Sequence, residues 1–237
     1  MHNDADFLAN LSNTFLIGGA LVTVWLTAAA ITGGLLLGLV VALLRVSGNR
    51  AGVAAARFYI WLFRGTPLLI QLVVIYSGLP QIGLKFGVIA SALIALILNE
   101  AAYLSEIIRS GFLSVPAGQR DAAAALGLPP WLVLRKVLLP QAIRIILPPL
   151  GNSVNGLLKA TSITSVISME ELMRRSEMLM QVKFDVLEVF AAAAVYYLLL
   201  TTAWDLVQRW LEARYARGYA APTPAAAPEF GHTVPAQ

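Results

Sequence analysis

The chain has 237 residues, of which 58% are hydrophobic and 13% are charged, and its formal net charge is +4. About a quarter of a water-soluble domain is usually charged, so this composition and the mean hydropathy of +0.74 exclude an ordinary soluble protein. The sequence contains no cysteine, which excludes disulfides, zinc fingers and thiol catalysis. We therefore predict an all-α integral membrane protein.

Long apolar runs predict five transmembrane helices, since a span needs about 20 mostly apolar residues. We expect these spans at about 15–44, 54–77, 87–108, 132–158 and 187–207. All five belong to one predicted domain of residues 1–217. The Ala- and Pro-rich residues 218–237 have little to bury and are predicted to form a disordered cytoplasmic tail.

The basic residues lie between the apolar runs, where they indicate membrane orientation and not nucleic-acid binding. Five spans place the two termini on opposite sides of the membrane. Of the 17 Lys and Arg residues, most then fall on the side of the carboxyl terminus. By the positive-inside rule, the amino terminus is expected outside and the carboxyl terminus in the cytoplasm.

A short helix is predicted at about 119–127, in the cytoplasmic loop between the third and fourth spans. Residues 120–126 are strong helix formers, and Gly127 followed by Pro129 is typical of a helix end. A helix that merely rests on lipid is the alternative, but such helices bury bulky apolar side chains. The alanines favour close approach of another protein, with Arg120 and Asp121 fixing orientation at the rim.

The same loop resembles the EAA loop of permease subunits of ABC importers. Asp121-Ala-Ala-Ala-Ala-Leu-Gly127 is followed, after nine residues, by Val137-Leu-Leu-Pro140. Asp121 stands where the family usually has Glu, and Val137 where it usually has Ile. The stretches RGTPLLIQLVVIYSGLP (64–80), AAYLSEIIRSGFLSVPAGQ (101–119) and GNSVNGLLKATSI (151–163) resemble the polar amino acid uptake branch of this family.

This resemblance implies a type I ABC importer permease (MetI-like) fold with five spans in a bacterial inner membrane. The implied partners are a cytoplasmic ABC ATPase dimer, a second copy or a homologous permease, and an external solute-binding protein. The implied substrate is an amino acid, and ATP and Mg²⁺ are expected on the ATPase, with no cofactor in this chain. Coupling to the ATPase is implied for Arg120, Asp121, Ala122, Ala123, Gly127 and Pro140.

Polar groups inside predicted spans are costly and by default suggest function. The candidate substrate-pathway residues are Gln71, Asn99, Glu100, Asn152 and Asn155. For Gln71 and Asn155, a hydrogen bond to a neighbouring helix is the alternative. Glu100 has no basic residue three or four positions away, so it either faces an aqueous cavity or pairs across helices. Glu106 precedes Arg109 by three residues, which predicts a structural ion pair.

Two other functions fit a membrane protein of this size. An ion-gradient-driven secondary transporter of small polar solutes is the main alternative, but no internal repeat is visible. An intramembrane enzyme would need paired acids or metal ligands, and Glu100 and Glu106 point in different directions on a helix. The sequence also contains no G-x-x-x-x-G-K-[ST] phosphate loop. We therefore expect a subunit that performs no covalent chemistry.

Overall fold

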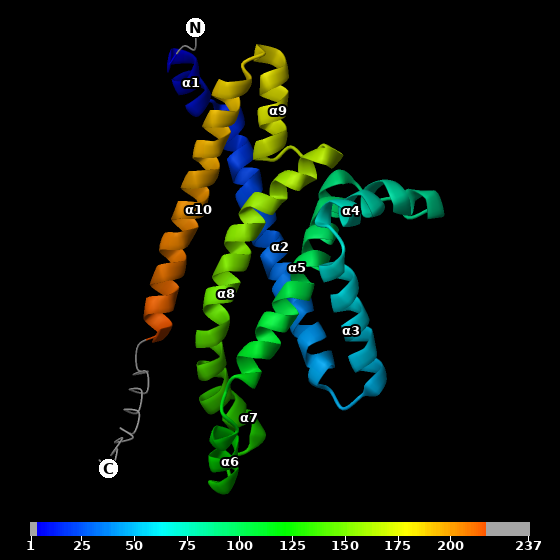
Figure 1. Cartoon of the computed structure of the whole chain (residues 1–237), viewed down its shortest axis with the longest axis vertical. Helices are drawn as coiled ribbons and strands as arrows, with labels where there is room; N and C mark the ends of the chain where they lie inside the picture. Colours follow the sequence, from blue (N-terminus) through cyan, green and yellow to red (C-terminus); the bar gives the residue numbers. More distant parts are fainter. Residues whose placement is uncertain (1–3, 217–237) are drawn as a thin grey trace, which may run out of the picture.

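The computed structural model describes residues 4–216, and the regular elements in this part of the chain are all helical (Figure 1). The α-helices are α1 (Asp4–Leu11), α2 (Thr14–Val46), α3 (Arg50–Gly65), α4 (Leu68–Val73), α5 (Val88–Leu113), α6 (Ala117–Ala125), α7 (Pro130–Val133), α8 (Leu139–Ala160), α9 (Leu172–Lys183) and α10 (Val186–Ala216). The tail predicted at residues 218–237 lies outside the described residues.

Short helical segments of other pitch extend three of these helices. Val74–Gly78 and Leu134–Leu138 are π-helical, while Leu79–Ile82 and Thr161–Ile167 are 3₁₀-helical. The π-helical segment before α8 joins it to α7, so the chain is helical through most of the predicted fourth span.

Within the described residues, three helices are long and apolar enough to cross a membrane: α2, α5 and residues 186–215 of α10. α3 and the segment from Leu68 to Ile82 qualify together as a fourth, although they meet at an angle of 105°. α8 covers most of the predicted fourth span but does not meet the same apolar criterion. The count of five spans therefore stays a prediction.

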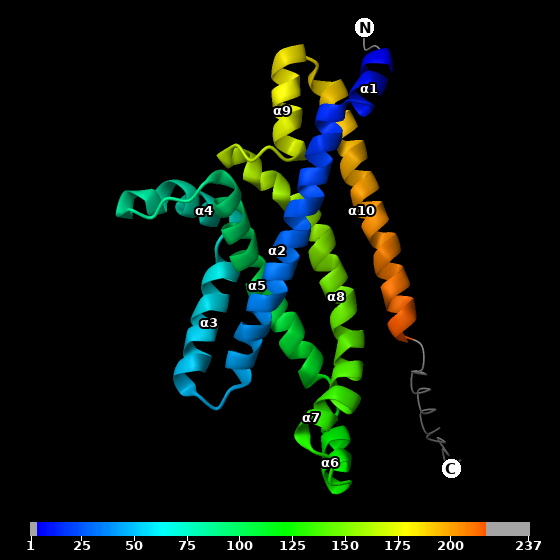
Figure 2. The same ribbon diagram turned by 180° about the vertical axis from the view of Figure 1, so that it is seen from behind.

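α2 and α5 form the most extensive helix pair of the bundle. Small residues allow this close approach, since a Cβ atom added at Gly34 of α2 would lie 3.2 Å from the Cβ atom of Glu100 on α5. α8 packs against α5 on one side and α10 on the other. Figures 1 and 2 show α6 and α7 at one end of the bundle and α1 and α9 at the opposite end.

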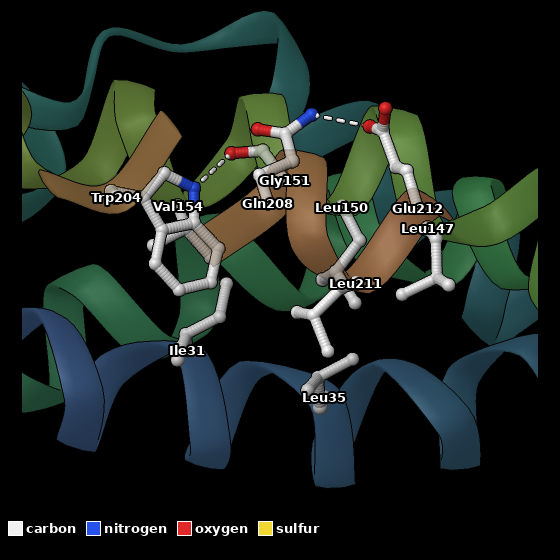
Figure 3. Close-up of a pocket in the computed structure, with 10 residues that line it drawn as sticks. All are labelled: Ile31, Leu35, Leu147, Leu150, Gly151, Val154, Trp204, Gln208, Leu211 and Glu212. Carbon is white, nitrogen blue, oxygen red and sulfur yellow. Dashed lines mark hydrogen bonds between the residues drawn. The ribbon is translucent and has the colours of Figure 1, made fainter. Parts of the chain in front are cut away.

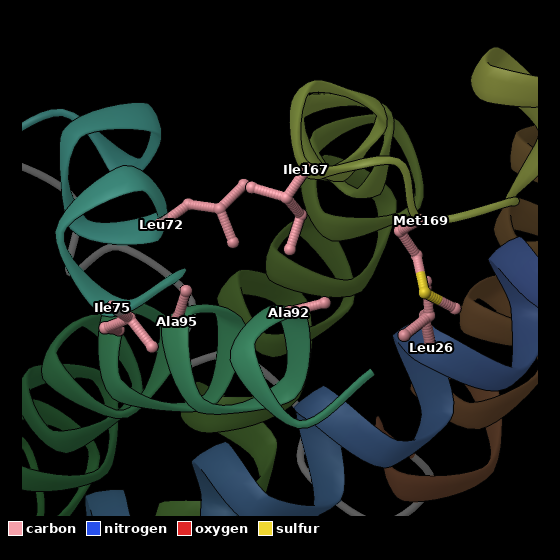
Figure 4. Packing of buried hydrophobic residues seen from close by; sticks show 7 residues of the cluster. All are labelled: Leu26, Leu72, Ile75, Ala92, Ala95, Ile167 and Met169. Carbon is pink, nitrogen blue, oxygen red and sulfur yellow. The ribbon is translucent and has the colours of Figure 1, made fainter. Parts of the chain in front are cut away.

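α4 lies across the other helices (Figure 1), and a buried apolar cluster fixes its position (Figure 4). The cluster joins α2, α4 with its π-helical extension, α5, and the segment that follows α8. Its members are Leu26, Leu72, Ile75, Ala92, Ala95, Ile167 and Met169. Because four separate parts of the chain contribute to it, the cluster holds the lateral α4 segment against the bundle.

Glu171 ties three helices together at the α9 end. Its side chain is fully buried, and it caps α9 by accepting hydrogen bonds from the backbone N–H groups of Met173 and Arg174, both at 2.9 Å. It also accepts from the hydroxyls of Tyr197 on α10 (3.1 Å) and Thr23 on α2 (3.4 Å). Burial raises the pKa of Glu171, and these four donors act in the opposite direction.

Candidate functional site

A break in the helical backbone separates α3 from α4. Proline disfavours helical conformation in the residue before it and has no N–H to donate. Thr66, which precedes Pro67, is accordingly extended, with φ −117° and ψ 145°. The predicted second span, 54–77, is a mostly apolar run that includes Arg57 and Arg64. The structure divides it at residues 66–67 and turns the chain by 105°.

The break lies about halfway along the bundle. α3 follows α2 after a short loop and runs back beside it (Figure 2). At 1.5 Å per residue, the 16 residues of α3 extend about 24 Å, against about 50 Å for the 33 residues of α2. Irregular backbone at such a depth is tolerated only where protein or a water-filled cavity surrounds it.

Two side-chain amides satisfy the backbone carbonyls at this break. Gln71 Nε2 lies 2.9 Å from the Phe63 carbonyl oxygen and 3.0 Å from that of Thr66. Asn99 Nδ2 on α5 donates to the Phe63 carbonyl (3.2 Å) and to Gln71 Oε1 (3.1 Å). The structure thus brings two of the predicted pathway residues together in one hydrogen-bonded group. This group stabilises the extended backbone at the break. The pathway role of both residues stays a prediction.

Glu100 is buried between α2, α5 and α8. Its carboxyl group lies close to the Ser153 hydroxyl of α8 and not to a basic group. Its Oε1 is buried and has no hydrogen-bond partner among the described residues. The contact across helices is thus to a hydroxyl instead of a charge. The pathway role expected for Glu100 stays a prediction.

Glu106 forms the ion pair that the sequence predicts. Its Oε2 lies 2.7 Å from Arg109 Nη2, one turn further along α5. Its Oε1 also lies 3.4 Å from the Nε atom of Arg45, at the end of α2. The prediction for Arg109 is confirmed, and the contact with Arg45 adds a link between α2 and α5 that local spacing could not reveal.

The two predicted amides of α8 have different surroundings. Asn155 Nδ2 donates to Asp205 Oδ1 of α10 at 2.8 Å, while Asn152 is exposed. The structure therefore does not bring them to a common partner. Asp205 was missed by the sequence analysis, although an acidic residue inside the predicted span 187–207 was the signal that could have identified it.

Further hydrogen bonds follow the same seam between α8 and α10. Trp204 Nε1 donates to the Gly151 carbonyl (2.9 Å), and Gln208 Nε2 donates to the Pro148 carbonyl of α8 (3.4 Å). Gln208 Nε2 also donates to Glu212 within α10 (2.8 Å). Figure 3 shows these groups along the rim of a mainly apolar pocket, to which α2 contributes Ile31 and Leu35. The pocket itself offers few polar groups to a polar solute.

The predicted cytoplasmic helix is present as α6, which ends in a hydrogen-bonded turn. Gly127 has φ +67°, a left-handed conformation that glycine adopts without strain. Its N–H donates to the Ala124 carbonyl (2.9 Å), and the N–H of Leu128 donates to the Ala123 carbonyl (3.1 Å). These two bonds form a Schellman motif, which stops a helix sharply.

Most of the predicted coupling residues lie on the outside of this end of the bundle. Arg120, Asp121 and Ala122 are exposed, whereas Ala123 is only 3% exposed. The remaining predicted coupling residue, Pro140, is exposed in the first turn of α8. The structure therefore leaves most of the α6 surface exposed, and the buried position of Ala123 indicates a packing role for that side chain. The coupling role of these residues stays a prediction.

Comparison with known proteins identifies the family. Residues 34–217 match the family described as "Binding-protein-dependent transport system inner membrane component". The chain is 40% identical over 188 residues to the putative glutamine transport system permease protein GlnP of Rickettsia felis, covering 78% of this chain and 86% of that protein. It is 37% identical over 201 residues to the glutamine transport system permease protein GlnP of Escherichia coli K12, covering 84% and 92%.

A solved structure supports the same assignment. The structure described as "Crystal structure of an amino acid ABC transporter with histidines" superposes with a TM-score of 0.83 at 37% identity, covering 90% of this chain and all of that one. The predicted importer permease fold is therefore confirmed, apart from the number of spans. The chain belongs to the family of binding-protein-dependent transport system inner membrane components, which are multi-pass permease subunits of ABC transporters.

Proposed function

We propose that this chain is the membrane-spanning subunit of an ATP-driven importer of amino acids, and that glutamine is the first substrate to test. Two relatives at 37% and 40% identity are named as glutamine transport permeases, and the superposed structure is that of an amino acid transporter. In this proposal the chain pairs with a second copy or a homologous permease. An external solute-binding protein delivers the substrate.

The exposed surface of α6 is the observation that carries the coupling part of the proposal. α6 lies beyond the ends of α5 and α8, away from the α9 end (Figure 1). Its exposed residues include Arg120 and Asp121, and Leu126, which caps its carboxyl end, is 76% exposed. A short helix of this kind fits a groove on an ATPase subunit, which would bind the ATP and Mg²⁺ and supply the hydrolysis.

The connections of α6 explain how movement of an ATPase would reach the membrane. α6 follows α5 after a turn at residues 114–116 and leads through α7 directly into α8. Displacement of α6 therefore moves two helices that pack against each other. Such rigid-body movement is a common way to switch between two states of an interface. The proposal places the α6 end in the cytoplasm and the amino terminus outside.

The test is uptake of labelled L-glutamine into vesicles that contain this permease, its ATPase and its binding protein. The proposal predicts uptake that requires ATP and all three components. A permease that accumulates glutamine from an ion gradient without the ATPase would support the alternative, a secondary transporter, and overturn the proposal. Uptake of other labelled amino acids in the same vesicles then defines the range of substrates.

A further inference from the structure

One face of α3 carries three exposed arginines at seven-residue spacing: Arg50, Arg57 and Arg64. Residues seven apart lie on the same side of a helix. Between residues 7 and 99 the sequence contains no Asp or Glu, so α2, α3 and α4 contribute no carboxylate to this face. An arginine here needs a partner from another helix, another molecule or water.

Arg64 lies deeper in the bundle than the other two. It is in the last turn of α3, next to the break, and thus about halfway along α2. Its guanidinium carbon lies 5.1 Å from the centre of the Tyr103 ring on α5, a distance at which a cation interacts with an aromatic face. Among the described residues it makes no ion pair. A charged group at membrane depth is costly and is by default a functional group.

The two acidic residues of α5 are not available to Arg64. Glu106, one turn beyond Tyr103, already pairs with Arg109 at 2.7 Å and with Arg45 at 3.4 Å. Glu100 is buried and lies near Ser153 on α8. The guanidinium of Arg64 is therefore exposed and lacks a carboxylate within the described part of the protein.

A guanidinium in this state matches a carboxylate from outside the chain. Its planar N–H groups form paired hydrogen bonds to both carboxylate oxygens, and it stays charged at any physiological pH. The Tyr103 ring restricts the position of the guanidinium, and Tyr103 is itself 39% exposed. The proposed function brings one anionic group to this depth of the membrane: the α-carboxylate that every amino acid carries.

We propose that Arg64, positioned by the Tyr103 ring, binds the α-carboxylate of the transported amino acid at the break between α3 and α4. This inference rests on the proposed function as an amino acid importer. It assigns recognition of the common part of all amino acid substrates to this site. Selection among side chains then belongs to other groups.

The test is direct binding to the purified permease–ATPase complex without nucleotide and without the binding protein, whose own selectivity would otherwise dominate. Labelled L-glutamine is displaced by unlabelled L-glutamine or by L-glutaminamide, which has an amide in place of the α-carboxylate. The wild-type complex should prefer glutamine to the amide by about tenfold or more, as expected for a charge-assisted hydrogen bond.

Arg64→Gln should lower the affinity for glutamine to about that for glutaminamide and so abolish the preference. Arg64→Lys keeps the charge but loses the paired geometry, and should give an intermediate affinity with a reduced preference. The matched control is Arg57→Gln, which removes the same charge from the same face two turns earlier and should leave both properties unchanged. Basal ATPase activity and elution of the intact complex report on folding.

Two results would overturn the inference. An undiminished preference for glutamine in Arg64→Gln would mean that another group binds the carboxylate. Equal weakening of glutamine and glutaminamide would assign Arg64 a structural role or an ion pair with the second permease. A wild-type complex that neither binds nor transports any amino acid contradicts the proposed function itself, so the two failures can be distinguished.

Discussion

Gln71 and Asn99 meet amide to amide, 3.1 Å apart, and both donate to the same carbonyl oxygen of Phe63. They come from α4 and α5, and they meet at the break between α3 and α4, where the chain turns by 105°. An extended backbone segment inside a membrane protein would leave carbonyl groups unsatisfied, and these two amides remove that penalty. Together with the buried apolar cluster, they support the lateral course of α4.

Replacing Gln71 with Leu should therefore destabilise the protein. The substitution leaves the Phe63 carbonyl with Asn99 as its remaining side-chain donor. The Thr66 carbonyl loses the hydrogen bond from Gln71. The expected cost is about 1–3 kcal/mol, the penalty for an unsatisfied buried polar group. It is measured as a lower midpoint of thermal unfolding in detergent. Gln81→Leu, at an exposed position on the segment after α4, should leave the midpoint unchanged; equal midpoints for both variants would contradict this interpretation.

A bulky residue at Gly127 should uncouple ATP hydrolysis from uptake. Gly127 has φ +67°, and a β-branched side chain such as that of Val is strained there. A Cβ atom added at Gly127 would meet no atom within 4 Å beyond the adjacent residues, so the substitution causes no clash. The backbone strain alone would make the end of α6 change its course. In Gly127→Val we expect ATPase activity to persist and glutamine uptake to fall by about tenfold or more, since a displacement near 1 Å can cost about a hundredfold.

The matched control for that variant is Gly118→Ala, which lies on the same helix with ordinary helical geometry and open space around it. It should transport normally, because alanine is a better helix former than glycine. Normal, ATP-dependent uptake by Gly127→Val would contradict the docking role of α6.

The two α8 amides should respond differently to the same substitution. Asn155→Leu leaves Asp205 without its donor inside an apolar helix, whereas Asn152 is exposed. We expect Asn155→Leu to cost about 1–2 kcal/mol and Asn152→Leu to change stability little, as measured by thermal unfolding. If affinity for substrate and uptake also survive both changes, the predicted role of these amides in the substrate pathway is wrong.

Removing the Glu171 carboxylate should loosen the α9 end of the bundle. Glu171→Ala deletes the cap of α9 and the shared acceptor for Thr23 and Tyr197. Loss of a helix cap alone costs about 0.5–2 kcal/mol. Faster backbone hydrogen exchange in α9 measures the effect, and Glu170→Ala, at the exposed neighbouring position, provides the comparison. Unchanged exchange in α9 would argue against the capping role.

The sequence was most informative where interactions are local. Continuous apolar runs place α2 and α5 within a few residues of their observed ends, apart from the longer carboxyl end of α5, and the spacing of Glu106 and Arg109 predicts their ion pair. Gly127 likewise marks a helix end by its own conformational freedom.

Features that depend on distant parts of the chain could not be predicted in the same way. The apolar run 54–77 conceals the break before Pro67, because hydropathy does not distinguish a straight helix from a bent one. The partner of Asn155 lies 50 residues further along the chain, and nothing in the spacing of α8 indicates it. The short α1 helix was also not predicted, since it is stabilised by packing against α10 rather than by its own sequence.

In the proposed mechanism, ATP hydrolysis by a separate subunit is transmitted through α6 and drives amino acid uptake by this chain. The most direct measurement compares labelled L-glutamine uptake into vesicles that contain the permease with its binding protein, either with or without the ATPase. Accumulation against a gradient only when the ATPase and ATP are both present is the predicted result. Accumulation by the permease in the absence of any nucleotide-hydrolysing subunit would contradict the account.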